Sequence, residues 1–300
     1  NPNYAMAHLN LGSILRDLGK SQEAELSTRK AIEINPNYAI SHSNLGSILR
    51  DLGKLEEAEL SARKAIELSP SLTDAHYNLG NILKDCGKLQ DAEMSTRKAI
   101  ELNPGYAMAH NNLGSILQDL GKAQEAELST RRAIELNPDF ANAYNNLGII
   151  LKNLGKLKEA ELLIRKAIEL KPKFALAHSN LGIIFQNLGK ISDSRKCFSS
   201  ASDCAPDNIF YFINSNLNLS PIMENNTQID SERNQYKKAI NNLKNKTNMI
   251  YGDPKSFASS AFNLAYQNRL DDREILEDFS DAISKSKGMI LNGFSYDKYL

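Results

Sequence analysis

Apolar residues recur at helical spacing along the first two-thirds of the chain, and glycine or proline interrupts them at regular intervals. In residues 5–19 the apolar side chains fall on one helical face, and a glycine follows as a C-terminal cap. In residues 22–36, Ala24 and Ala31 share a face, and the pattern stops before Pro36. The pattern predicts two antiparallel helices joined by a tight turn.

The same helix pair returns six times with a period of 34 residues. The glycine of the motif Asn-Leu-Gly marks the period, at Gly12, Gly46, Gly80, Gly114, Gly148 and Gly182. With position 1 at Ala5, the units are residues 5–38, 39–72, 73–106, 107–140, 141–174 and 175–208. Residues 1–4 match positions 31–34 of a unit, so we expect Asn1 to be a cut within a longer array.

Each repeating glycine lies in the middle of a predicted helix, where it costs about 1 kcal/mol relative to alanine. Six glycines at one position therefore predict a close contact between the two helices of each unit, too tight for a methyl group.

These residues resemble the tetratricopeptide repeat, with Leu-Gly at positions 7 and 8, Gly at 15, Ala at 20 and 27 and Pro at 32. The resemblance covers residues 1–208. It implies an all-α, right-handed superhelix whose first helices line a concave face. Two positions depart from the family pattern: position 4 carries His or Tyr, and position 24 carries Thr, Ala or Ile until Phe198 restores an aromatic residue.

Beyond residue 208 the period fades, although the pattern stays helical. Residues 208–219 predict one more helix, whose aromatic side chains seal the array. Residues 220–226 read as a loop, and Thr227 as the N-cap of a helix near 228–246. Asp253-Pro254 begins a further predicted helix, and residues 271–287 form an amphipathic one. We therefore predict a capping helix and helical connector over 209–300, leading into an absent downstream domain.

Composition excludes several classes of protein. Lys plus Arg equals Asp plus Glu at 36 each, so no net charge attracts nucleic acid or an anionic membrane. No apolar run approaches the roughly 20 residues of a membrane span. Three cysteines without a CxxC motif favour a reducing compartment, and we expect a cytoplasmic protein. Nothing in the sequence supports a homo-oligomer.

No catalytic, cofactor or metal site is predicted within these residues, because no phosphate-binding loop, HExxH or GxSxG motif occurs. All five histidines occupy position 4 of their units, which indicates a packing role: His8, His42, His76, His110 and His178. Cys86 and Cys204 replace aliphatic residues of the other units, as buried free cysteines do.

One asparagine at position 6 of every unit is the candidate binding site: Asn10, Asn44, Asn78, Asn112, Asn146 and Asn180. A carboxamide both donates and accepts hydrogen bonds, so such a row can hold the main chain of an extended peptide with little regard to its sequence. The alternative is that each asparagine bonds a neighbouring helix. Basic residues at position 12 are each followed by Asp or Asn, which predicts a face of mixed charge.

Residues 219–285 resemble the connector of bacterial proteins similar to O-GlcNAc transferase and the plant SPINDLY proteins. The resemblance rests on Arg233 and Tyr236, and on a later stretch comprising Phe262, Leu264, Ala265, Tyr266, Gln267, Asp272 and Arg273. It implies a downstream glycosyltransferase that uses a UDP-sugar, and it implies that the asparagine row holds acceptor peptides. No catalytic residue of that enzyme lies in these 300 residues.

We therefore expect an interaction scaffold for extended peptides or proteins, forming the acceptor-binding part of a protein O-glycosyltransferase. Two alternatives stay open. One is a free-standing scaffold in which 209–300 is a cap and docking element. The other is an enzyme complete within this chain.

Overall fold

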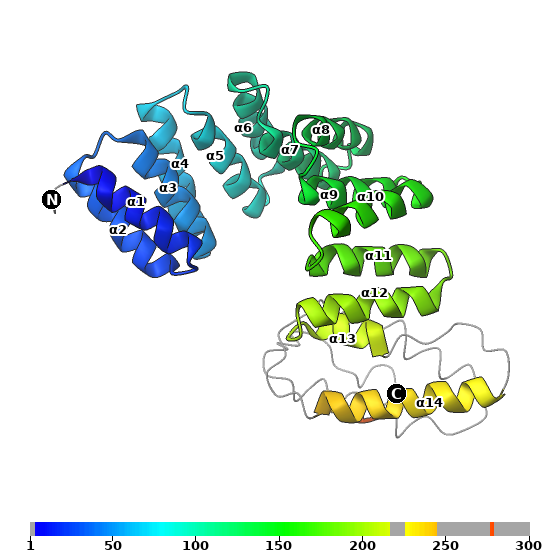
Figure 1. Ribbon diagram of the computed structural model, residues 1–300. Helices are drawn as coiled ribbons and strands as arrows, with labels where there is room; N and C mark the ends of the chain where they lie inside the picture. The colour runs from blue at the N-terminus through cyan, green and yellow to red at the C-terminus, as the bar shows by residue number, and fades with distance from the viewer. Residues whose placement is uncertain (1–3, 217–225, 245–276, 279–300) are drawn as a thin grey trace. The chain divides into compact units, whose positions relative to one another are not determined.

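The structure is a computed structural model that describes residues 4–216, 226–244 and 277–278. Fourteen α-helices and no β-strand are assigned within these residues (Figure 1). The chain forms two compact units, Asn1–Gly155 and Lys156–Leu300. The boundary between them falls between the two helices of the fifth repeat. The sequence-based division at residue 208 stays a prediction.

Two helices lie within each 34-residue repeat. The first helices have 13 residues each: Ala5–Asp17 (α1), Ala39–Asp51 (α3), Thr73–Asp85 (α5), Ala107–Asp119 (α7), Ala141–Asn153 (α9) and Ala175–Asn187 (α11). The second helices have 14 residues each: Ser21–Ile34 (α2), Leu55–Leu68 (α4), Leu89–Leu102 (α6), Ala123–Leu136 (α8), Leu157–Leu170 (α10) and Ile191–Cys204 (α12).

A glycine at position 15 ends every first helix, as the sequence predicted. Gly19 has a φ of 75°, in the left-handed region that glycine adopts without strain. The amide of Lys20 donates to the carbonyl of Leu15 at 2.9 Å, and that of Gly19 to Arg16 at 2.9 Å. These two bonds form a Schellman motif, which satisfies carbonyls at the helix end and turns the chain toward the second helix.

The glycine at position 8 faces position 24 of its partner helix, which confirms the predicted close contact. A methyl group added at Gly12, Gly80 or Gly114 would overlap the threonine hydroxyl at position 24 of the same repeat. At Gly46, where the facing residue is Ala62, the added methyl would lie 3.1 Å from the Ala58 carbonyl oxygen. The small side chains at position 24 therefore match the helix separation that glycine permits.

Within residues Asn1–Gly155, the first helix of each repeat contacts both the second helix and the first helix of the preceding repeat. Buried aliphatic residues of α3 and α5 form a continuous core with the alanines of α4 and α6, including Leu49, Ala58, Ile82 and Ala92. Because these helices touch side by side along the array, positions on their shared face form a continuous surface. We call it the first-helix face.

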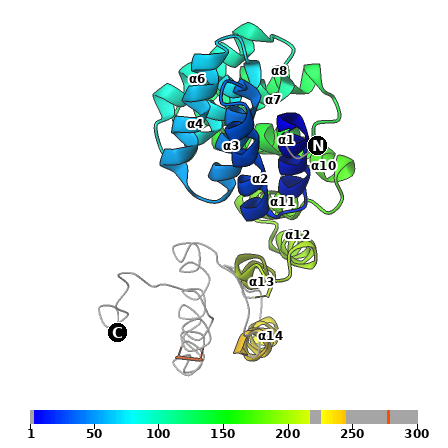
Figure 2. The same cartoon turned by 90° about the vertical axis from the view of Figure 1, so that its left-hand side faces the viewer.

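Aromatic side chains of α12 and the helix after it form a cluster within the second unit. Helix α13 (Ile209–Asn216) packs on α12, and α12, α13 and α14 lie side by side when viewed nearly end-on (Figure 2). The ring of Phe210 meets that of Phe198 edge to face, with centroids 5.8 Å apart. Phe198 is fully buried, and Tyr211 and Phe212 are each 8 % exposed.

Helix α14 extends over Asn226–Lys244, close to the predicted 228–246. Thr227 lies inside its first turn, so the prediction that Thr227 is the N-cap is wrong. Arg195 of α12 pairs with Glu232, and this pair connects α12 to α14. The helix predicted after Asp253-Pro254 lies outside the described residues, as does the 220–225 part of the predicted loop. Of the helix predicted over 271–287, only residues 277–278 are described, and they are helical. Among the described residues, no helix is long and apolar enough to cross a membrane.

Candidate functional site

The asparagine row lies on the first helices, and its members differ in exposure. Asn10 is exposed, Asn44, Asn78, Asn146 and Asn180 are half-buried, and Asn112 is 9 % exposed. Position 2 of the same face carries exposed apolar residues, among them Met6, Ile40 and Met108. The face therefore offers polar groups beside apolar side chains in the same repeat.

Three of the asparagines bond the preceding first helix in similar ways. The Asn44 amide nitrogen donates to the Ser13 hydroxyl at 3.2 Å, and that of Asn78 donates to Ser43 at 3.0 Å. The Asn146 amide donates to the Asn111 carboxamide oxygen at 3.0 Å. The neighbouring-helix alternative therefore describes the amide nitrogens of these residues.

Asn112 differs because it bonds the second helix of the preceding repeat instead of the first. Its amide nitrogen lies 3.4 Å from the Thr96 hydroxyl of α6. The side-chain oxygens of Asn44, Asn78 and Asn112 accept no hydrogen bond from any described residue. The amide nitrogens of Asn44, Asn78, Asn112 and Asn146 are thus engaged inside the array, while the oxygens of Asn44, Asn78 and Asn112 stay unused. The Asn146 oxygen differs, because it accepts from the Asn145 amide at 3.4 Å.

Position 5 of the first helices is buried in several repeats. Leu9 is 4 %, Ser43 1 % and Asn145 1 % exposed. Side chains at this position pack between successive first helices, and Ser43 also accepts a hydrogen bond from position 6 of the next repeat. In these repeats, positions 2 and 6 are more accessible than position 5.

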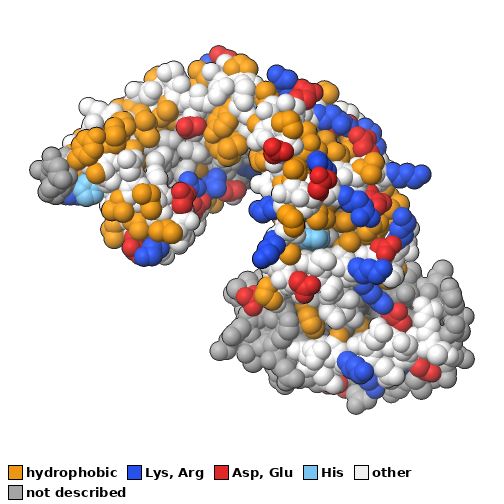
Figure 3. Space-filling model, in the orientation of Figure 1, with side chains coloured by type: hydrophobic (Ala, Val, Ile, Leu, Met, Phe, Trp, Pro, Cys, Tyr) orange, Lys and Arg blue, Asp and Glu red, His pale blue; other side chains and the backbone are white. Residues whose placement is uncertain are grey.

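Charged residues along this face pair from one repeat to the next. Arg16 Nε lies 2.6 Å from an oxygen of Asp51, Arg50 lies 3.5 Å from Asp85, and Lys84 lies 3.4 Å from Asp119. Each of these cations at position 12 thus meets the aspartate at position 13 of the following repeat. Lys152 occupies the same position in α9 and has no ion pair with any described residue. The face is of mixed charge, as predicted, and both signs also alternate over the surface drawn in Figure 3.

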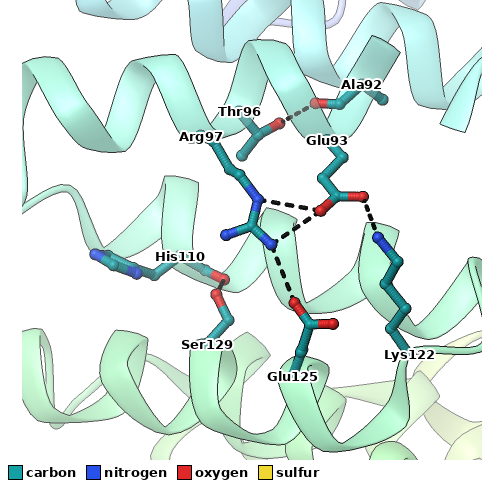
Figure 4. Close-up of polar contacts among 8 residues, drawn as sticks. All are labelled: Ala92, Glu93, Thr96, Arg97, His110, Lys122, Glu125 and Ser129. Carbon is teal, nitrogen blue, oxygen red and sulfur yellow. Dashed lines mark hydrogen bonds and ion pairs between the residues drawn. The ribbon is translucent and has the colours of Figure 1, made fainter. Parts of the chain in front are cut away.

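The second helices carry a network of ion pairs that links successive repeats (Figure 4). Arg97 bonds Glu93 four residues before it at 2.9 Å, and it reaches Glu125 of the next repeat at 3.2 Å. Lys122, also of the next repeat, lies 2.8 Å from Glu93. The pairs within each helix follow from the sequence spacing, whereas the pairs between repeats were missed. A lysine at position 16 of all six repeats was the signal.

The same carboxylate is enclosed by these pairs in three repeats. The side chains of Glu25, Glu59 and Glu93 are only 12 %, 14 % and 13 % exposed. Hydrogen bonds from Lys54, Lys88 and Lys122 are the main cause that lowers the pKa of these glutamates below the ordinary 4.5, while burial opposes them. Each glutamate is therefore more stable as an anion in the folded chain than in the unfolded chain.

This arrangement predicts an acid-sensitive array. A depressed folded pKa contributes stability that is present above the unfolded pKa of about 4.5 and is lost as pH falls through the folded value. Urea unfolding of the double variant Glu59→Gln and Glu93→Gln should therefore show a weaker dependence on pH below 4.5 than the parent chain. Glu67→Gln with Glu101→Gln is the control, because it removes two glutamates that are more than two-thirds exposed. Equal pH profiles for parent and test variant would contradict the prediction.

The histidines have a structural role in the connection between repeats. His42, His76, His110 and His178 each donate Nε2–H to the carbonyl of the proline six residues earlier, at 2.8 to 3.1 Å. Among the residues that the structure describes, no group of His, Cys, Asp and Glu is arranged to hold a metal ion. Burial raises the pKa of Cys197 to about 11 and also raises that of Cys86, so neither thiol ionises readily at neutral pH.

A cavity of about 530 Å³ lies between α6, α7 and α8. Leu113 and Leu117 of α7 are buried, whereas Leu128 of α8 is 70 % exposed. The charged lining residues Arg97 and Glu125 already bond each other. The cavity is thus a gap between adjacent second helices. Of its charged groups, Arg97 and Glu125 belong to the network of Figure 4, while Glu101 pairs with Lys98 and Arg132 with Glu135.

Models of known protein families match several segments of the chain. Models of the tetratricopeptide repeat match residues 5–38 and 73–106, residues 28–59, 96–127 and 130–161, and, as a TPR repeat, residues 46–87. Together these matches cover more than half of the 300 residues. The chain belongs to the tetratricopeptide-repeat (TPR) family. Its described helices form the paired array of a TPR solenoid.

Solved TPR structures share this fold. PilW, a type IV pilus biogenesis factor, is 19 % identical and aligns over 67 % of this chain and 94 % of its own with a TM-score of 0.61. PilF of Pseudomonas aeruginosa is 18 % identical, covering 69 % and 94 %, with a TM-score of 0.59. A thermophilic TPR protein of Thermus thermophilus is 23 % identical, covering 61 % and 100 %, with a TM-score of 0.55. At these identities the likeness concerns the fold alone. No curated protein matches the chain.

Proposed function

We propose that this TPR array binds extended peptide segments of partner proteins along its first-helix face. The observation that carries the proposal is the fixed orientation of the asparagine row. Asn44 and Asn78 each donate to the preceding first helix, and this bond holds the carboxamide while its oxygen stays unused. Oxygens repeated on α3, α5 and α7 can accept hydrogen bonds from the N–H groups of an extended main chain.

The binding expected from such a row is graded. A hydrogen bond contributes about 0.5–1.5 kcal/mol net, so several rungs give moderate affinity that depends on peptide length. Main-chain bonds do not read side chains, and the exposed apolar residues at position 2 give only broad preferences. The proposed partner is therefore an extended segment of varied sequence rather than one fixed motif.

The test compares asparagine variants in a peptide-binding assay. Asn44→Ala and Asn78→Ala should each raise the Kd for a labelled Ser/Thr-rich 14-residue peptide roughly 2- to 12-fold, the range given by one hydrogen bond. Gln124→Ala removes the same carboxamide group from the exposed side of α8 and should leave the Kd unchanged. Fluorescence anisotropy gives the Kd, and circular dichroism checks that each variant is folded.

The atom that accepts can be identified with a peptide in which one amide is replaced by an ester. The ester lacks the N–H donor, so the ester peptide should bind the parent chain more weakly than the amide peptide. When the ester lies opposite Asn78, the difference in affinity between the two peptides should be smaller for the Asn78→Ala variant. Unchanged affinity of folded asparagine variants for every peptide would overturn the proposal.

The narrower proposal is that the array is the acceptor-binding part of a protein O-glycosyltransferase. Its support is the resemblance of residues 219–285. Of the residues that carry this resemblance, only Arg233 and Tyr236 are described by the structure, and both lie in α14. In α14 Tyr236 is fully buried and Arg233 is 8 % exposed, so both side chains are packed within the fold. Phe262, Leu264, Ala265, Tyr266, Gln267, Asp272 and Arg273 lie outside the described residues, and the family matches lie within residues 5–161.

A free-standing scaffold is the alternative to this narrower proposal. The two are separated by incubating the natural full-length protein with a UDP-sugar and a bound peptide, and measuring the peptide mass. A mass increase of one sugar supports the transferase, whereas binding without transfer supports the scaffold.

A further inference from the structure

The third repeat departs from the others on the first-helix face. Position 2 carries exposed apolar residues in four repeats: Met6, Ile40, Met108 and Leu176. The third repeat instead places the exposed Asp74 there, and Tyr77 follows one turn later at position 5. Residues three apart share a helix face, so both side chains belong to the same part of α5.

A second tyrosine completes the cluster. Tyr106 immediately precedes α7, and its hydroxyl donates to Asp74 Oδ1 at 3.1 Å. Its ring lies against that of Tyr77, with centroids 5.1 Å apart and an interplanar angle of 49°. Burial and the neighbouring Asp74 carboxylate raise the pKa of Tyr106, so its hydroxyl stays protonated and continues to donate.

The charge of Asp74 is uncompensated among the described residues. Three other aspartates of the face, Asp51, Asp85 and Asp119, each meet a cation from the preceding repeat. Asp74 forms no ion pair with any described residue, and its side chain accepts a hydrogen bond from the Tyr106 hydroxyl. A carboxylate accepts through two oxygens, so Oδ2 remains for a ligand.

We propose that Asp74, Tyr77 and Tyr106 form a subsite for an arginine side chain of the bound peptide. The proposal rests on peptide binding along the first-helix face and names one specificity within it. A guanidinium is planar, so it can lie over a tyrosine ring while its N–H groups bond a carboxylate beside that ring. Lysine offers a point charge without this planar match.

The cluster also has a structural role, which the experiment has to separate from binding. The bond from Tyr106 to Asp74 connects the turn before α7 to α5, so Asp74→Ala would remove both that bond and the charge. Asp74→Asn retains an oxygen that can accept from Tyr106 and removes only the charge. The deciding readout is therefore a ratio of affinities for two peptides, which a change in stability alone does not alter.

The experiment uses the whole 300-residue chain and two labelled peptides. Both are Ser/Thr/Ala-rich 14-mers with the same sequence except at one position. That position is arginine in one peptide and citrulline, the neutral isostere of arginine, in the other. The parent chain should bind the arginine peptide about tenfold more tightly, and Asp74→Asn should abolish this preference while the citrulline affinity stays the same. Tyr77→Leu should reduce the preference, because the ring is lost.

Asp91→Asn is the matched control, because it removes one negative charge from the second helix of the same repeat. It should keep the full preference for arginine. A preference that persists in Asp74→Asn, or that Asp91→Asn reduces equally, would overturn the subsite while leaving the asparagine row intact. Failure of the parent chain to bind either peptide would overturn both the subsite and the proposed function.

Discussion

Replacing Ile48 by alanine should lower the free energy of unfolding by about 2–5 kcal/mol, the range for a buried isoleucine whose loss leaves a cavity. Ile48 is 1 % exposed at position 10 of the second repeat. The same replacement at Ile14 should cost less than about 1 kcal/mol, because Ile14 is 56 % exposed. Urea unfolding followed by circular dichroism measures both.

The comparison is sharp because the two isoleucines have the same local sequence. Residues 10–20 and 44–54 both read Asn-Leu-Gly-Ser-Ile-Leu-Arg-Asp-Leu-Gly-Lys. Helix propensity and capping are therefore identical, and only the neighbouring helices differ. Similar losses at Ile14 and Ile48 would show that the burial difference between the first two repeats does not hold in solution.

The fold followed from the sequence because the signals repeat. Glycine at position 15 has to adopt a positive φ, and glycine at position 8 has to accept a close helix, so both residues report geometry directly. Which aliphatic residues are buried did not follow. Leu60 and Leu128 are aliphatic residues of amphipathic helices, yet they are 69 % and 70 % exposed. Periodicity alone does not distinguish them from Ile82, which is fully buried.

The sequence predicts which residues form the candidate row, but it does not predict which of their atoms are already hydrogen-bonded inside the array. A row of asparagines is visible as a period, whereas the engagement of the Asn78 amide by Ser43 depends on how closely two helices approach. The cluster at Asp74 was missed because a period reveals only what every repeat shares. Its signal was the reverse, a single repeat in which position 2 changes from apolar to acidic. Specific recognition in a regular array depends on such departures, since identical repeats cannot read different peptide residues.

Regularity and stability are connected in this chain through the contact between the two helices of a repeat. The repeats stack through a fixed spacing between helices, and that spacing depends on position 8 staying without a side chain. Gly114→Ala places a methyl group against the Thr130 hydroxyl, so one helix has to shift or one side chain has to turn. Thr130 is fully buried and donates to the Ala126 carbonyl at 2.8 Å, which leaves little room to turn.

Gly114→Ala should therefore destabilise the chain by about 1–3 kcal/mol through overpacking, reduced by the roughly 1 kcal/mol that alanine gains over glycine inside a helix. Adding Thr130→Ala removes the overlapping hydroxyl, and the double variant should recover most of the loss. Gly46→Ala is the control, because Ala62 already faces it and the nearest atom lies at 3.1 Å. It should cost less than Gly114→Ala.

A double-mutant cycle from urea unfolding measures the coupling between positions 8 and 24. Strong coupling would mean that the glycine at position 8 and the threonine at position 24 depend on each other. A shorter distance between the two helices would then compensate for the aromatic residue that the TPR pattern has at position 24. Additive losses would instead assign the cost of Gly114→Ala to the Ala126 carbonyl oxygen, which lies 3.2 Å from the added methyl. The helix separation would then be set by the backbone, and position 24 could vary without it, as it does between Thr96, Ala62 and Ile164.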